Sequence, residues 1–91
     1  WYRMFEECNN LTYLTLGEGF FKSSATEIDF SYLLNWNEDS FIGSVVTNSY
    51  DRATNGLPNL EIVLHPNIYA YLTDEHKATL TAKGYIVTSV S

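Results

Sequence analysis

A short apolar template, Leu-x-x-Leu-x-Leu, recurs along the chain and constrains its fold more than any other feature. LTYLTL at residues 11–16 and LPNLEI at residues 57–62 match it well, and ATEIDF at residues 25–30 is a weaker copy. Apolar residues that alternate with period two place one face of a short strand in a core and the other face outward. Because the copies share this phase and no tight hairpin joins them, we expect parallel neighbouring strands in a stack.

Helical segments separate these strands. The first is expected over residues 38–55, with Asn37, Asp39 or Ser40 capping its start and Asn55-Gly56 ending it. Its apolar side is formed by Phe41, Ile42, Val45, Val46, Ser49, Tyr50 and Ala53.

The C-terminal part follows a similar order of elements. After a turn at residues 65–67 and a short helical turn at 68–72, Thr73 should cap a second helix that stops at Gly84. Residues 85–90 then form a last strand. This segment lacks the leucine template, and terminal repeats of solenoids are atypical because they cover the open end of the core. We therefore expect two parts: leucine-rich repeats over residues 1–64, irregular at 21–56, and a C-terminal cap over residues 65–91.

Length and charge exclude several classes of protein. Ninety-one residues suffice for one small domain or part of one, and the start at Trp1 rather than Met suggests a cut through a longer protein. No apolar stretch has the roughly 20 residues of a membrane span. The net charge is −6 and the five basic residues are scattered, which argues against a nucleic-acid partner. The single cysteine, Cys8, excludes an intrachain disulfide.

One stretch carries a more specific pattern. In MFEECNNLTYLTLGEGF, residues 4–20, a Met-Phe pair, a cysteine, three leucines and a later phenylalanine fall at regular offsets, namely Met4, Phe5, Cys8, Leu11, Leu14, Leu16 and Phe20. This stretch resembles the BspA-like leucine-rich-repeat family. Residues 57–64 match only the strand part of that repeat, and residues 21–56 depart from it. The ending LTDEHKATLTAKGYIV resembles, more loosely, the C-terminal caps of such proteins from gut bacteria and their phages.

The resemblance implies an α/β fold, a fragment of a leucine-rich-repeat solenoid with short parallel strands, helical crossovers and a C-terminal cap. It also implies a non-enzymatic module for adhesion or protein binding, at the C-terminal end of a larger secreted or cell-surface protein, without a cofactor. The alternative is a structural or receptor-binding component of a phage particle.

The residues themselves offer little chemistry. Cys8 has no recognisable histidine partner, and His65 and His76 lack the neighbouring ligands of a metal site. A sugar-binding interpretation would use aromatic platforms, for which Trp1, Tyr13, Trp36 and Tyr71 are candidates, but aromatic residues more often pack in a core.

The outward side of the predicted strands is the better candidate site. The residues expected there are Tyr13, Thr15, Glu27, Asp29, Glu61 and Val63. Repeat proteins commonly bind through such a face. Three neighbouring carboxylates repel one another, which predicts a basic partner or a cation, although a merely solvated acidic face is the simpler alternative. A catalytic carboxylate pair would need a cleft, which an open sheet face does not supply. Finally, an N-terminal edge left bare of upstream repeats would favour self-association there.

Overall fold

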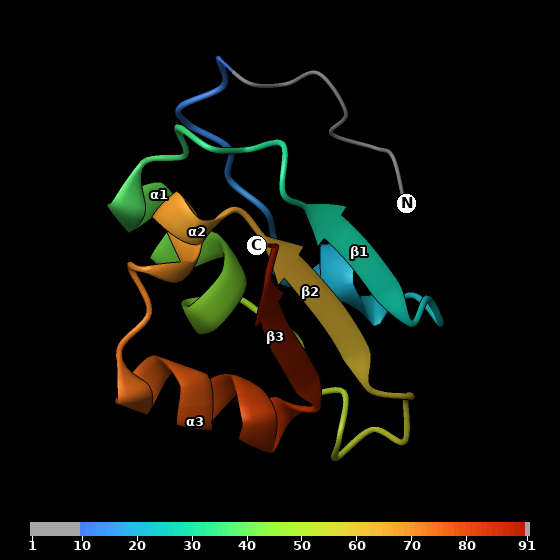
Figure 1. Cartoon of the computed structure of the whole chain (residues 1–91). Helices are drawn as coiled ribbons and strands as arrows, with labels where there is room; N and C mark the ends of the chain where they lie inside the picture. The colour runs from blue at the N-terminus through green and yellow to red at the C-terminus, as the bar shows by residue number, and fades with distance from the viewer. Residues whose placement is uncertain (1–9, 91) are drawn as a thin grey trace.

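Three parallel strands form one open sheet in the computed structural model, which describes residues 10–90 (Figure 1). They are β1 (Glu27–Phe30), β2 (Leu60–Leu64) and β3 (Tyr85–Ser89), with β2 in the centre. Ile28 lies beside Ile62 in the register, and Ile62 lies beside Val87. Residues 10–90 thus form a small mixed α/β domain, and no solenoid or repeated unit is shown within them.

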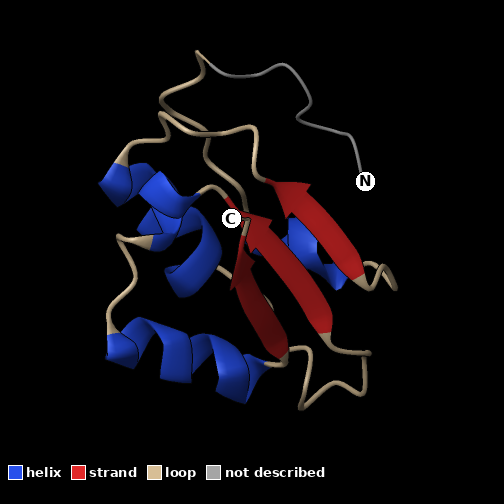
Figure 2. Cartoon of the chain, in the orientation of Figure 1, coloured by secondary structure: helices blue, strands red, loops and turns tan. Residues whose placement is uncertain are grey.

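The helical segments cover only one side of this sheet. Figure 2 shows them behind and beside the strands, with no helix across the side that faces the viewer. In chain order they are the 3₁₀ helix η1 (Glu18–Lys22), α1 (Glu38–Phe41), the π-helical segment η2 (Ile42–Thr47), α2 (Pro66–Tyr69) and α3 (Asp74–Lys83). No helix within residues 10–90 is long and apolar enough to cross a membrane.

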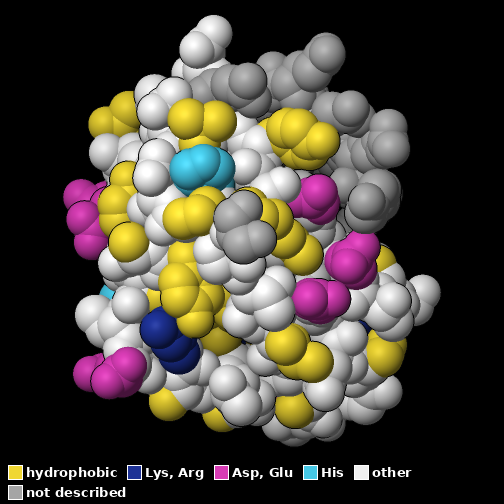
Figure 3. All heavy atoms as spheres, viewed as in Figure 1, with side chains coloured by type: hydrophobic (Ala, Val, Ile, Leu, Met, Phe, Trp, Pro, Cys, Tyr) yellow, Lys and Arg dark blue, Asp and Glu magenta, His cyan; other side chains and the backbone are white. Residues whose placement is uncertain are grey.

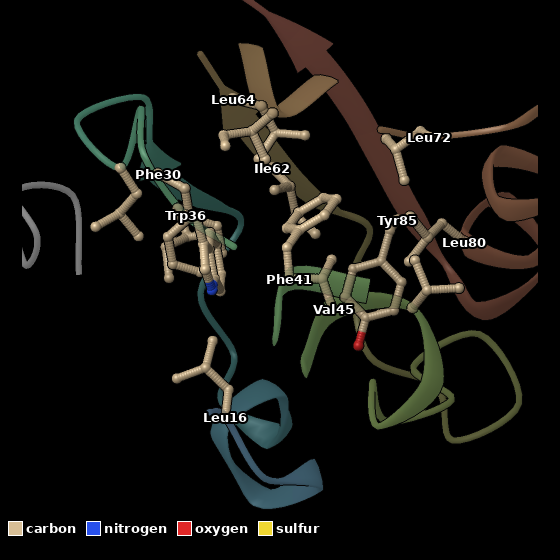
Figure 4. Close-up of a cluster of buried hydrophobic side chains, with 14 of the residues drawn as sticks. Leu16, Phe30, Trp36, Phe41, Val45, Ile62, Leu64, Leu72, Leu80 and Tyr85 are labelled. Atoms are coloured by element: carbon tan, nitrogen blue, oxygen red, sulfur yellow. The ribbon is translucent and has the colours of Figure 1, made fainter. Parts of the chain in front are cut away.

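The core lies between the sheet and the helices (Figure 4). The inward side chains of the strands are buried: Ile28, Phe30, Leu60, Ile62, Leu64 and Tyr85. Trp36 stands edge-on to the rings of Phe30 and Phe41, at centroid distances of 5.4 and 5.1 Å. Burying one large apolar side chain contributes about 1.5–3 kcal/mol, so this layer supplies much of the driving force for folding.

The predicted strand at residues 11–16 is wrong, because the segment belongs to no sheet. Side chains of Trp36, α1 and η2 form hydrogen bonds with the backbone of this segment instead. The carbonyl of Leu14 accepts hydrogen bonds from Ser40 Oγ at 2.8 Å, Ser44 Oγ at 3.0 Å and Trp36 Nε1 at 3.2 Å. The Leu16 amide donates to Ser44 Oγ at 2.9 Å. Leu16 is buried, as the period-two pattern predicts. The backbone of this segment, however, is bonded by side chains and not by a neighbouring strand.

The predicted helix over residues 38–55 starts correctly but ends early. Asn37 caps it by accepting a hydrogen bond from the Ser40 amide, and regular helix gives way to η2, which ends at Thr47. The Lys83 ammonium donates to the carbonyls of Val46 and Ser49, at 3.0 and 3.2 Å. These carbonyls near the helix end are therefore satisfied without a further helical turn.

The C-terminal elements follow the sequence pattern closely. Thr73 Oγ1 accepts from the His76 amide at 3.1 Å and caps α3, and Gly84 ends the helix with φ of 96°. The short helix before it, α2, begins at Pro66 with His65 as its cap, two residues earlier than expected. Because β3 pairs directly with β2, residues 85–89 belong to the same sheet as the strands before them. The division of the chain at residue 64 stays a prediction.

Candidate binding face of the sheet

The side of the sheet opposite the helices is formed by alternate residues of the three strands. Glu27, Glu61 and Ile86 lie beside one another in one row of the register, and the next row consists of Asp29, Val63 and Thr88. We call these six residues the outer face. Their inward neighbours, such as Ile28 and Ile62, are buried, whereas none of the six is.

This arrangement is unusual for parallel strands. Parallel sheets are generally covered on both sides, because their crossover helices pack on both faces. Here both crossovers contribute to one helical layer, and residues 10–90 place no helix on the outer face. Within the described part of the chain, the outer face is therefore not covered by a helix.

Three carboxylates occupy the β1 and β2 part of the outer face. Glu27 and Glu61 are direct neighbours in the register. Glu61 Oε2 accepts a hydrogen bond from Thr88 Oγ1 at 3.3 Å, and Asp29 Oδ1 accepts from both the amide and the hydroxyl of Ser31. These bonds orient two of the carboxylates and leave their charge in place. Figure 3 shows acidic side chains grouped over this part of the sheet.

The basic residues within 10–90 are occupied elsewhere. Lys22 lies over the Tyr50 ring, 5.2 Å from its centroid, and Lys77 lies 4.7 Å from the centroid of Tyr69. The other two, Arg52 and Lys83, donate to main-chain carbonyls. None of the three outer-face carboxylates forms an ion pair within the described part of the chain, so their charge is not neutralised there.

The other half of the outer face, formed by Val63, Ile86 and Thr88, is uncharged. Ile86 is 49% exposed on β3, and the half-buried Val63 lies between it and β1. Val90, just beyond β3, is 38% exposed. The outer face is therefore acidic toward β1 and uncharged toward β3, where Ile86 offers hydrophobic contact.

Four of the six residues predicted for the site lie together on the outer face: Glu27, Asp29, Glu61 and Val63. Tyr13 and Thr15 are both exposed, but no strand places them beside β1, because their segment is bonded to α1 and η2. Ile86 and Thr88 were not among the residues predicted for the site. Their alternation with Tyr85 and Val87 was the available signal, but we assigned the segment to a cap.

The remaining candidate residues either take part in local hydrogen bonds, are buried in the core, or lie outside the described residues. His65 Nδ1 accepts from the Asn67 amide, and His76 Nδ1 accepts from the Thr73 amide. Trp36 is only 1% exposed, which is incompatible with a sugar-stacking role. Cys8 and Trp1 lie outside residues 10–90. Residues 10–90 contain neither a pocket nor a cluster of three or more His, Cys, Asp or Glu residues that could hold a metal ion.

Comparisons of the chain with protein-family models, with curated proteins and with solved structures find no match. The likeness to leucine-rich repeats therefore depends on the residues quoted above, and the candidate site depends on its geometry.

Proposed function

We propose that this chain is a non-enzymatic binding module that recognises a basic protein surface through the outer face of its sheet. The observation that carries the proposal is a parallel-sheet face that residues 10–90 leave uncovered, with three carboxylates that have no cationic partner among those residues. Lysine or arginine residues of a partner would relieve the repulsion between Glu27 and Glu61. Apolar contact with Val63 and Ile86 would add hydrophobic stabilisation on the other side.

The wider setting of this module is also a proposal. The repeat-like stretch at residues 4–20 and the parallel strands support placing it at the C-terminal end of a leucine-rich-repeat protein that is secreted or displayed at a cell surface. The same repeat scaffold can bind many different ligands, so the fold does not identify the ligand. We therefore propose only that its surface is basic with an apolar part.

The test compares two variants of equal net charge. In the first, Glu27→Gln, Asp29→Asn and Glu61→Gln neutralise the outer face; in the second, three exposed carboxylates of the helical layer are neutralised by Glu38→Gln, Asp39→Asn and Glu75→Gln. The probe is an eight-residue peptide of lysine and alanine with one central isoleucine, and the readout is its Kd by NMR titration.

We expect the outer-face variant to bind about tenfold more weakly than the native chain, since each exposed ion pair contributes up to about 1 kcal/mol. The helical-layer variant should bind like the native chain. Equal weakening in both variants would mean that net charge alone attracts the peptide, and the proposal would fail.

A further inference from the structure

Two residues on the outer edge of β3, Val87 and Ser89, have backbone groups without a partner among residues 10–90. The Leu60 amide donates to the Gly84 carbonyl at 3.1 Å, and the Val90 amide donates to the Leu64 carbonyl at 3.0 Å. In a parallel sheet, the backbone groups of successive residues point alternately toward and away from the neighbouring strand. These two bonds therefore show that the even-numbered residues of β3 bond to β2. The N–H and C=O groups of Val87 and Ser89 therefore point away from the sheet. No residue within 10–90 bonds to them.

This edge also lacks the features that usually prevent strand addition. Exposed edges are normally protected by charged residues, proline or a bulge. The sequence of β3, YIVTS, has no charge and no proline, and its register with β2 is continuous. Three of its five residues, Ile86, Val87 and Thr88, are β-branched and favour strand structure.

We propose that β3 is a self-association edge, at which two copies of this chain pair their β3 strands antiparallel to form one six-stranded sheet. This pairing, centred on Val87, places Val87 opposite its symmetry mate, where each Val87 can both donate to and accept from the other. Ile86 of each copy then lies opposite Thr88 of the other. No like charges meet across this interface.

Charge selects this edge over the one at β1. The same antiparallel pairing of two β1 strands would place Glu27 opposite Asp29 of the second copy, twice. Like charges directly opposite each other destabilise a strand pair. The edge of β1 is thus the less suitable of the two for a second copy, and the self-association expected at the N-terminal end of the chain stays a prediction.

Symmetry gives the dimer a functional consequence. Antiparallel strands within one sheet are related by a twofold axis perpendicular to the sheet, so both outer faces point in the same direction. The uncharged halves, which include Ile86, lie near the axis, and the two acidic halves lie at the far ends. If the proposed function holds, the dimer engages a multivalent basic surface through two sites at once, and avidity raises its apparent affinity. The dimer itself does not depend on that function.

The experiment measures the association of the full 91-residue chain by sedimentation equilibrium. Ile86→Lys combined with Thr88→Lys places lysine opposite lysine at both cross-strand positions of the proposed pairing. The matched control, Ala78→Lys with Ala82→Lys, adds the same charge to exposed positions of α3. Circular dichroism and thermal unfolding establish that both variants fold.

We expect a concentration-dependent dimer for the native chain and the α3 control, and a dimerisation Kd at least about tenfold higher for the β3 variant. Amide hydrogen exchange at Val87 and Ser89 should slow as the native protein is concentrated. A native chain that stays monomeric at millimolar concentration would overturn the proposal. So would a dimer that persists unchanged in the β3 variant, because its interface would then lie elsewhere.

Discussion

The guanidinium of Arg52 donates a 2.7 Å hydrogen bond from Nη1 to the main-chain carbonyl of Phe21, 31 residues earlier in the chain. The same side chain donates to the carbonyls of Ser23 and Ala25, at 2.7 and 2.8 Å, and to that of Pro58 at 3.0 Å. Arg52 is fully buried. It therefore joins the segment that enters β1 to the segment that enters β2, and so supports two of the three strands of the outer face.

Replacing Arg52 should destabilise the protein strongly. Arg52→Met leaves four carbonyls without this donor, and hydrogen bonds to a charged group contribute about 1.5–3 kcal/mol each, so we expect a loss of at least about 3 kcal/mol. Arg52→Lys should recover only part of this loss, because an ammonium cannot reproduce the planar fork of the guanidinium. The free energy of unfolding in urea measures both. Lys77→Met, a change at a surface cation, is the control and should cost about 1 kcal/mol or less. A similar cost at both sites would refute the proposed role of Arg52.

A second prediction concerns the attachment of residues 10–17 to the helical layer. Ser44 is buried, accepts from the Leu16 amide and donates to the Leu14 carbonyl. Ser44→Ala removes both bonds and should cost about 2 kcal/mol. Limited proteolysis should then cleave within residues 10–17 earlier than in the native chain. Thr47→Ala, at an exposed position of the same π-helical segment, should leave both the stability and the cleavage rate nearly unchanged.

The strands of the sheet could be predicted where alternate residues of the sequence are apolar and are buried on one side of the sheet. Ile28, Ile62 and Leu64 follow the period-two pattern and are buried in the sheet. The same pattern misled us at Leu14 and Leu16, because a segment whose backbone is bonded by Ser40 and Ser44 can show the same alternation as a strand. Periodicity reports which side of a segment is buried, and it does not report which groups satisfy the backbone.

The limits of the site prediction have a similar origin. Glu27, Asp29, Glu61 and Val63 could be assigned to one face because side chains alternate along a strand. Ile86 could not be added without knowing that β3 continues the sheet. The four carbonyls around Arg52 come from two separate segments, residues 21–25 and Pro58, and only the folded path of the chain brings them together. No local pattern marks such a residue.

The carboxylate of Asp51 should titrate below its ordinary range. The Thr54 amide donates to Oδ1 at 3.1 Å and the Thr54 hydroxyl donates to Oδ2 at 2.8 Å, and these bonds hold the pKa of Asp51 below the usual 3.8. A lowered folded-state pKa means that the ionised group stabilises the fold above the unfolded-state pKa, and that this contribution is lost as the pH falls through the folded-state pKa. Thr54→Ala keeps the amide bond, the larger cause, so the pKa should rise only part of the way. An NMR titration of the Asp51 side-chain carboxyl carbon measures the pKa in both proteins. An unchanged pKa in Thr54→Ala would show that the hydroxyl has no effect.

Two glycines with left-handed backbones should respond differently to the same substitution. Gly84 has φ of 96°, and a Cβ there would lie 3.0 Å from the Ala53 nitrogen and 3.3 Å from Cβ of Arg52. Gly56 has φ of 74°, and a Cβ there would have no neighbour within 4 Å among the described residues. Gly56→Ala should therefore cost only the backbone strain of about 1 kcal/mol, whereas Gly84→Ala adds a steric clash and should cost about 3 kcal/mol. Urea unfolding of the two variants measures the difference. Equal costs would mean that the end of α3 can move away from Arg52, and the close contact between the two segments would then contribute little to the fold.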